Sequence, residues 1–561
     1  MSPSCLKCRE KFSVSDDDIS FLETISPVVG GRKELLPPPT LCPDCRQQRR
    51  LAFRNERRLY ARKCDLTGKQ IISSYSADKS FKVYDQAEWW SDAWDPLSYG
   101  RSFDFSQSFF EQFTALQREV PRVSVINTNS ENSVYTNYTA NNKNCYLIFS
   151  NSYGHNEDCF YGTCLSKSVS CVDSINIFNC QLCFDCIDCT DCYSLLSSRN
   201  CNECQESFFL SDCRRCKNCI GCKGLRDKQY CVQNKQYTKD EYTKLLEQSA
   251  THTHAGYEGI RSFFDAFDKS TPHLFSRQKN CEQCTGDYLQ SSRECIQCFD
   301  TNQSEHCRYV QYSVSDDFNC CDASYLVDST NCYENLSLVQ CSDCHFTDLT
   351  WWGVHGVLYS ELCFNSTHDC FGCIGLRGKQ YCILNQQYTK EEYEQLVPKI
   401  IQHMRKTKEW GEFFPINLSP FGYNETIAHE YVPLSEAVVK KHGWNWHVEE
   451  EEQNQYLGPV YAIPDGIRDV SDDIVKHILR CSVSGKPYKI IPQELKFYRQ
   501  MNIPIPRKCP DQRHKERMAL RNPRKLWDRK CGKCQKQIAT SYSPERSGIV
   551  YCEECYLASV Y

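Results

Sequence analysis

Eight cysteines near the two ends of the chain have the type and spacing of zinc ligands. They form two quartets, each made of two C-x2-C pairs: Cys5, Cys8, Cys42 and Cys45, and Cys531, Cys534, Cys552 and Cys555. Zn²⁺ binds four ligands at the corners of a tetrahedron, and two C-x2-C turns supply them. A site closed by four thiolates leaves no position open for a substrate, so the sequence predicts two structural zinc ions.

A stripe of basic residues follows Cys45, and a matching stripe follows Cys509. The members recur at every fourth position: Arg46, Arg50, Arg54, Arg58 and Arg62, and Arg513, Arg517, Arg521, Lys525 and Arg529. This spacing predicts a helix with a basic face that begins at the C-x2-C turn, as in a treble clef, although Pro523 could divide the second copy into two short helices. Such a face suits nucleic-acid phosphates, RNA more than DNA. The same arginines could instead pair with acidic residues elsewhere in the chain.

Both stripes belong to a duplicated module. CPDCRQQRRLAFRNERRLYARKC, from Cys42, aligns with CPDQRHKERMALRNPRKLWDRKC, from Cys509, at a constant offset of 467. Each copy keeps one complete quartet and the remains of a second site. The remains are Cys64 with Thr67 and Asp85 in the first copy, and Cys481 and Cys509 with Ser484 and Gln512 in the second.

Thirty further cysteines lie between Cys145 and Cys382. Many recur at intervals of 21, as do Cys159, Cys180, Cys201 and Cys222, which predicts a solenoid with rungs of about that length. A second duplication, at an offset of 151, relates CIGCKGLRDKQYCVQNKQYTKDEY to CFGCIGLRGKQYCILNQQYTKEEY. We therefore expect a mainly β chain whose centre is a right-handed parallel β-helix (β-solenoid) in two halves, flanked by the zinc-ribbon or treble-clef modules.

The central thiols allow three interpretations. Stacked rungs would bury them as a ladder of small hydrophobic side chains, which the sequence favours. Neighbouring C-x-x-C pairs could instead bind additional zinc or an iron–sulfur cluster. Disulfides are the third interpretation and would require an oxidising compartment.

The repeats divide the chain into seven predicted segments. They are a zinc module with a basic helix (1–85), an aromatic-rich cap (86–122), a first cysteine-rich array with a capping helix (123–250), a helical linker (251–280), a second array with a capping helix (281–407), an irregular linker (408–470) and a second zinc module (471–561). Helical spacing of apolar residues predicts helices near 109–117, 239–248, 260–267 and 390–406.

Composition argues against a membrane protein. The first residues, MSPSCLKCREK, contain no apolar leader, and no stretch approaches the roughly 18 apolar residues that span a bilayer. Dense cysteines without a leader are typical of a reduced compartment. We therefore expect a cytoplasmic protein that does not contact a membrane.

Residues that could support catalysis are isolated from one another. His252, His254, His345 and His355 have no Cys or Asp partner at a recognisable spacing, and neither a phosphate-binding glycine loop nor a nucleophile elbow is present. Parallel β-helices do host carbohydrate lyases and hydrolases, so a carbohydrate-active enzyme remains an alternative.

Three long motifs together resemble one protein family. They are LPPPTLCPDCRQQRRLAFRNERRLYARKCDLTGKQI, KQYCILNQQYTKEEY and IPQELKFYRQMNIPIPRKCPDQRHKERMALRNP. The chain is similar over nearly its whole length to the uncharacterised cysteine-rich zinc-ribbon proteins of metagenome-derived ultra-small bacteria. That resemblance implies a bacterial, cytoplasmic zinc protein and implies no mechanism.

The sequence thus favours a non-enzymatic zinc-binding scaffold that docks a polyanion, RNA or a ribonucleoprotein, through the arginine stripes. A metal-storage or redox protein that uses the central C-x-x-C clusters is the first alternative. A carbohydrate-active β-helix enzyme is the second.

Overall fold

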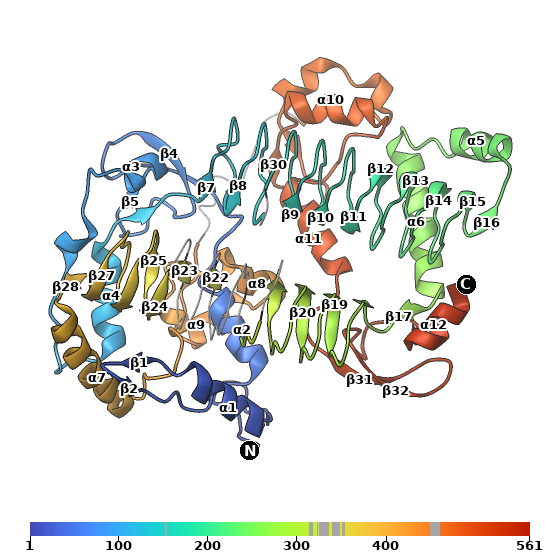
Figure 1. The fold of residues 1–561 in the computed structure, drawn as a ribbon. Helices are drawn as coiled ribbons and strands as arrows, with labels where there is room; N and C mark the ends of the chain where they lie inside the picture. The colour runs from blue at the N-terminus through green and yellow to red at the C-terminus, as the bar shows by residue number, and fades with distance from the viewer. Residues whose placement is uncertain are drawn as a thin grey trace.

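The computed structural model describes residues 1–151, 154–313, 318–322, 324, 336–338, 348–350, 354–448 and 460–560. Cys332, Cys341, Cys344 and His345 lie outside these residues. The described chain is a mixed α/β, multidomain molecule with many short parallel sheets (Figure 1). It is not mainly β as expected, because helices from both ends and both linkers pack against the sheets.

Short parallel strands make up the first cysteine-rich array. Its strands are β7 (Asn127–Thr128), β8 (Thr139–Ala140), β9 (Thr163–Ser166), β10 (Ile175–Phe178), β11 (Ile187–Thr190), β12 (Tyr193–Leu196), β13 (Gln205–Phe208), β14 (Lys217–Ile220), β15 (Gln229–Val232) and β16 (Lys235–Gln236). All pairings are parallel except that of β15 with the short return strand β16.

Strand register in this array corrects the predicted rung length of 21. Ile175 pairs with Thr163 on one side and with Ile187 on the other, so paired positions are related by an offset of 12. Backbone φ is positive at every third residue from Asp158 to Asn218. Buried residues also recur every third position, as in Cys180, Cys183 and Cys186. Both 12 and 21 are multiples of three, so the cysteine spacing reports inward positions rather than strand partners.

The second array has the same local construction. Its strands are β18 (Gln278–Lys279), β19 (Gly286–Gln290), β20 (Cys298–Asn302), β21 (Gln311–Ser313), β22 (Leu336–Leu338), β23 (Asp348–Thr350), β24 (His355–Leu358), β25 (Glu361–Cys363), β26 (His368–Phe371), β27 (Gln380–Ile383) and β28 (Gln386–Gln387). Gly286 pairs with Cys298 at an offset of 12, whereas Val357 pairs with Cys370 at an offset of 13. Single-residue insertions therefore interrupt this array.

Helices close both arrays and connect the modules. Those around the arrays are α3 (Gln86–Trp90), α4 (Phe109–Glu119), α5 (Lys239–Gln248), α6 (His254–Ser270), α7 (Lys390–Thr407), α8 (Ile427–Tyr431) and α9 (Glu436–Lys441). Short 3-10 helices are Pro96–Tyr99, Ile416–Leu418, Tyr423–Glu425, Ile467–Asp469 and Asp472–Lys476. The four predicted helices are confirmed, and α6 is longer than expected. The division into seven segments stays a prediction.

Two copies of one hairpin identify the duplicated modules. The first module contains α1 (Asp16–Ile25), β1 (Val28–Val29), β2 (Arg32–Lys33), α2 (Pro43–Leu51), β3 (Tyr60–Lys63), β4 (Gln70–Ser73) and β5 (Val83–Tyr84), and β5 pairs with β6 (Arg122–Val123). The second contains β29 (Leu479–Arg480), β30 (Pro487–Tyr488), α10 (Pro492–Gln500), α11 (Pro510–Leu520), β31 (Trp527–Lys530), β32 (Gln537–Thr540), β33 (Val550–Tyr551) and α12 (Glu553–Val560). Tyr60 pairs with Ser73 as Trp527 pairs with Thr540, so the register of the hairpin is the same in both copies.

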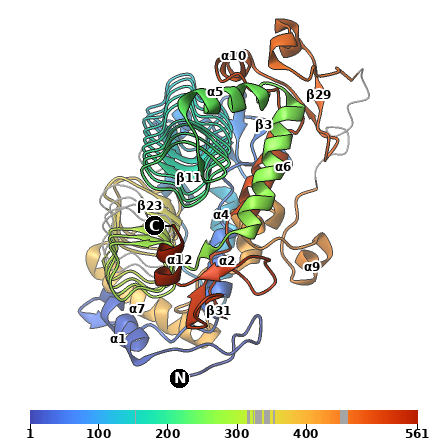
Figure 2. The same ribbon diagram turned by 90° about the vertical axis from the view of Figure 1, so that its right-hand side faces the viewer.

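The two arrays lie side by side, and elements of both modules pack along them (Figures 1 and 2). Phe109 of α4 contacts Tyr359 and Phe371 of the second array. Helix α10 adds Phe497 and Tyr498 to a cluster with Phe184 of the first array. Aromatic side chains of the linkers and modules thus pack against the arrays, while cysteines, leucines and serines are buried within them.

Candidate metal centres and their supporting ion pairs

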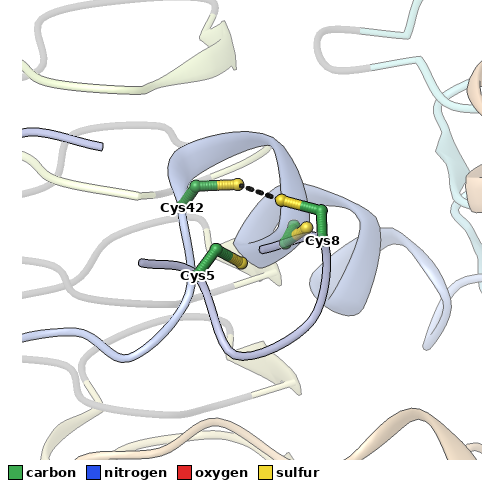
Figure 3. A group of neighbouring side chains, drawn as sticks. Cys5, Cys8 and Cys42 are labelled. Carbon is green, nitrogen blue, oxygen red and sulfur yellow. Dashed lines mark hydrogen bonds between the residues drawn. The ribbon is translucent and has the colours of Figure 1, made fainter. Parts of the chain in front are cut away.

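The N-terminal quartet forms a compact cluster of sulfur atoms. The four Sγ atoms of Cys5, Cys8, Cys42 and Cys45 all lie within 4.8 Å of one another. Figure 3 shows the side chains of Cys5, Cys8 and Cys42 directed toward a common centre, with the Sγ atoms of Cys8 and Cys42 3.7 Å apart. Four converging thiols are a donor set that fits a tetrahedral zinc ion.

Each half of this quartet comes from a tight turn or a helix start. The amide of Cys5 donates to the carbonyl of Glu10 at 2.8 Å, and Arg9 closes the turn with a φ of 67°. Cys42 is the N-cap of α2, and Cys45 lies in its first turn. The hydrogen bond from the Cys45 thiol lowers the pKa of Cys42 to about 5, which favours the thiolate that a metal requires.

The C-terminal quartet uses the same two devices. Cys531 and Cys534 lie in the turn between β31 and β32, and Cys552 and Cys555 lie at the start of α12. All four Sγ atoms are again within 4.8 Å of one another. Burial raises the pKa of Cys531, but hydrogen bonds from the amides of Cys534 and Cys552 outweigh it and lower the pKa to about 6.

The decayed sites retain the backbone of a metal knuckle. The amide of Cys64 donates to Lys69 at 2.8 Å and that of Cys481 to Lys486 at 2.9 Å, as Cys531 does to Lys536. The amide of Asp85 reaches the Sγ atom of Cys64 at 3.2 Å, which repeats the contact of Cys552 with Cys531 at 3.3 Å. Among the described residues, only the two complete quartets bring three or more metal-binding side chains together.

The first arginine stripe is buried rather than displayed. Arg46 and Arg50 share the carboxylate of Asp322 in the second array, at 2.8 and 3.2 Å. Arg50 is fully buried. Arg54 pairs with Glu56 at 2.5 Å and lies over the ring of Tyr138. Array carboxylates and module side chains therefore enclose these three arginines, which agrees with the alternative that the stripe pairs with acidic residues of the chain.

Equivalent arginines of the second stripe contact the first array. Arg513 and Arg517 share Asp173, at 3.1 and 2.9 Å. Arg521 joins both arrays, because it pairs with Asp188 of the first at 3.1 Å and with Asp300 of the second at 2.5 Å. Arg524, which the spacing rule did not select, also pairs with Asp300, at 2.8 Å.

The remaining stripe residues leave the helix. Because α2 ends at Leu51 and α11 at Leu520, Arg62 and Arg529 lie in strands β3 and β31 instead. Arg62 pairs with Asp65 at 2.8 Å, and Arg529 donates to the carbonyl of Ser543 at 3.3 Å. The single helical face predicted from the spacing is therefore a helix followed by a hairpin strand in each copy.

Arg58 and Lys525, which occupy equivalent positions of the two modules, form reciprocal contacts. Arg58 pairs with Asp511 at 3.2 Å, and Lys525 pairs with Asp44 at 3.2 Å. Asp44 and Asp511 are themselves equivalent positions of the duplicated module. Mutual exchange of equivalent partners is the arrangement of a two-fold interface, here within one chain.

Most of the central cysteines in the described residues are buried. Cys186 donates from Sγ to the carbonyl of Leu195 at 3.6 Å, and Cys180 to that of Cys189 at 3.5 Å, each at the same separation along the chain. All the cysteines in the described part of the chain are free thiols. This geometry agrees with the buried ladder predicted from the sequence.

The sequence did not identify the carboxylates that receive the arginines. The aspartates that receive the arginines, such as Asp173 and Asp322, stand at positions of positive φ, where Asn and Asp are tolerated better than other residues. The signal available in the sequence was the recurrence of aspartates at intervals of three residues.

Among the described residues, the structure contains no helix with the length and apolar character needed to cross a membrane.

Comparisons with known proteins add little. No family model matches the chain, and no curated protein matches its sequence. A solved structure from Desulfovibrio desulfuricans G20, described provisionally as an acetyltransferase, is 8% identical over 48% of this chain and 82% of its own, with a TM-score of 0.10. That similarity is too weak to bear on fold or function. What stands is a cysteine-rich protein with two tetra-cysteine clusters consistent with zinc sites, without a family assignment.

Proposed function

We propose that this protein is a non-enzymatic scaffold held together by two structural zinc ions. One observation carries the proposal: the arginines beside the knuckles form ion pairs with carboxylates of both arrays instead of lining a cleft. The N-terminal zinc ion would fix the start of α2, which supplies Arg46 and Arg50, and the C-terminal zinc ion would fix the β31–β32 hairpin that follows α11 and its arginines.

We further propose that each array is a right-handed parallel β-helix whose coil length equals the most frequent pairing offset, 12. Parallel pairing at that offset, together with a buried residue at every third position, supports coils with four short sides. The thiols would then serve packing, which argues against metal storage. Asp173, Asp185 and Asp188, which could form a catalytic carboxylate face, are covered by arginines of α11 and of the loop that follows it, which argues against a carbohydrate-active enzyme.

Polyanion docking, with RNA as the partner, is proposed only for the basic residues that keep exposure. The side chain of Arg58 is 40% exposed and that of Lys525 is 52% exposed, and they lie on either side of the reciprocal contact between the modules. Their ion pairs are weak in solvent, so phosphates could displace the aspartates. The double variant Arg58→Glu with Lys525→Glu should abolish low-salt RNA binding and leave the zinc content unchanged.

Metal analysis of the full chain tests the scaffold. Purification without chelators should give about two zinc ions per chain. Cys8→Ser and Cys534→Ser should each remove one ion, whereas Cys64→Ser and Cys481→Ser, in the decayed sites, should remove none. A much higher metal content, or the visible absorbance of an iron–sulfur cluster, would favour metal storage instead.

A further inference from the structure

A cavity of about 340 Å³ opens beside the second module. Its walls come from the first array, from helix α6, from helix α11 and from the segment Ile503–Pro504–Ile505–Pro506 that precedes α11. This volume lies in the range of sites that enclose small molecules. Neither the zinc quartets nor the central thiols line it.

The cavity combines an apolar wall with charged side chains of both signs: Asp173, Asp185, Glu258 and Glu516 line it together with Arg261, Arg513 and Arg517, and two further basic groups lie at its edge. Phe184, Tyr257 and Ile505 supply aromatic and aliphatic surface. Arg507 and Lys508 are 38% and 32% exposed, and each is held by one carboxylate, Asp465 and Glu516 respectively. Partly exposed pairs of this kind are weak, so an incoming anion can recruit both cations.

A buried donor in the wall lacks an acceptor. Arg517 lines the cavity with 2% of its surface exposed, and its two terminal nitrogens contact Asp173 and Asp185. Its Nε atom has no hydrogen-bond partner among the described residues. Because a buried donor without an acceptor is costly, an anionic group that reached this nitrogen would be stabilised.

The equivalent place in the other half of the molecule is filled. There Asp322 and Arg46 take the positions of Asp173 and Arg513, and the adjoining cavity measures only about 20 Å³. Helix α1 supplies Phe21 and Leu22 to that wall. Of these two equivalent places, one is thus filled by side chains and the other contains the cavity of about 340 Å³.

We propose that the open cavity binds a small organic anion, with an apolar body against Tyr257 and a carboxylate or phosphate group near Arg507 and Lys508. Arginine suits both anions because its planar fork matches their oxygen atoms. Burial, with the positive charge of Arg507 adding to it, lowers the pKa of His254 at the same wall, so that imidazole stays uncharged near neutral pH. With His254 uncharged, the anionic group meets the positive charges of Arg507 and Lys508 at the edge and the Nε donor of Arg517 in the wall.

Calorimetric titration of the zinc-loaded full chain tests this site with three probes: 4-ethylbenzoate, phenyl phosphate and the neutral 4-ethylbenzamide. At least one anion should bind, and the amide should bind at least tenfold more weakly. Binding of only one anion identifies the group as carboxylate or phosphate. Equal affinity for the amide, or no binding by any probe, overturns the proposal.

Variants locate the binding. Arg507→Gln and Lys508→Gln should each weaken anion binding severalfold, and Leu520→Trp, at an exposed position on the wall, should block it. Lys515→Gln, on the exposed side of the same helix, should have no effect. If Lys515→Gln weakens binding as much as Arg507→Gln, the anion binds elsewhere. Unchanged zinc content in all four variants separates this result from failure of the scaffold.

Discussion

At the level of single residues, the main stabilising feature is a buried aspartate that serves two arginines. Asp300 is paired with both Arg521 and Arg524 and is almost fully buried. Burial alone raises the pKa of this carboxyl, but the two guanidinium groups prevail and lower it. Such a cluster favours one relative placement of module and array, because removing a member takes an ion-pair partner from a buried charge.

Replacing Asp300 by Asn should destabilise the protein strongly. Loss of the shared carboxylate takes an ion-pair partner from two buried guanidinium groups and leaves Arg521 with Asp188, and breaking a buried pair in this way costs about 3–5 kcal/mol. The urea midpoint should fall accordingly, whereas Asp227→Asn, in the exposed pair with Arg215, should leave it unchanged. Because the folded pKa of Asp300 is depressed, its contribution is present above its unfolded value of 3.8 and is lost as the pH falls further. An unaltered midpoint would contradict this role.

His514 should make the protein sensitive to mild acid. Burial, then the charge of Arg57, lowers the pKa of His514 to about 4, although Glu430 opposes the shift. A histidine with a depressed pKa contributes its full stability above 6.5, and that contribution is lost as the pH falls to about 4. The loss is on the order of 3 kcal/mol. In melting curves over this window, His514→Gln should be less pH-dependent than the parent, while the exposed His477→Gln should match the parent.

Sequence spacing could predict the zinc quartets but not the arginine pairs, and the reason is the range of the interaction. Two cysteines in C-x2-C are brought together by one turn, so Cys531 and Cys534 can be interpreted without knowing the fold. Arg50 meets Asp322 only after the second array has formed beside α2. The regular spacing predicted one shared helical face, which the structure keeps only for the arginines within α2 and α11, and it could not show what covers them.

At the level of elements, the arrays are built from triplets in which one residue takes a left-handed conformation. From Asp158 to Asn218 this residue occurs at every third position, and the residue that follows it points inward. Small or short polar side chains suit both the left-handed position and the inward position, which explains the density of Asn, Asp, Ser and Cys. Because inward positions recur at every third residue, cysteines 21 residues apart resembled equivalent positions of successive rungs, although paired strand residues are 12 apart.

A β-branched residue at a left-handed position should therefore be costly. Glu203 is exposed and has a φ of 54°, whereas Gln205, which follows shortly after it, is exposed in strand β13. Glu203→Val should lower stability by about 1 kcal/mol, and Gln205→Val should be neutral or slightly favourable. Glu203→Gly should be tolerated. Thermal melting of the three variants measures the difference, and equal losses for the two valines would argue against the triplet rule.

At the level of the whole molecule, the helix that begins each arginine stripe is anchored to the array that lies further from it in sequence. Helix α2 of the first module contacts Asp322 of the second array, and helix α11 of the second module contacts Asp173 of the first array. The offsets of 467 and 151 revealed the duplications in the sequence. This crossed arrangement could not be predicted, because neither offset specifies which copy meets which.

Crossed anchoring predicts that local damage appears at a distance in sequence. Asp173→Ala should increase amide hydrogen exchange in α11 and in the strands around residues 160–190, and leave α2 protected, since α2 depends on Asp322. Asp322→Ala should give the converse pattern, with faster exchange in α2 and around residues 295–322. Mass spectrometry of both variants, each compared with the exposed-pair control Asp227→Asn, measures the two patterns. Exchange that rises uniformly in both variants would mean that the halves unfold as one unit. If Asp173→Ala instead raised exchange in α2 and not in α11, the crossed pairs would not anchor the modules.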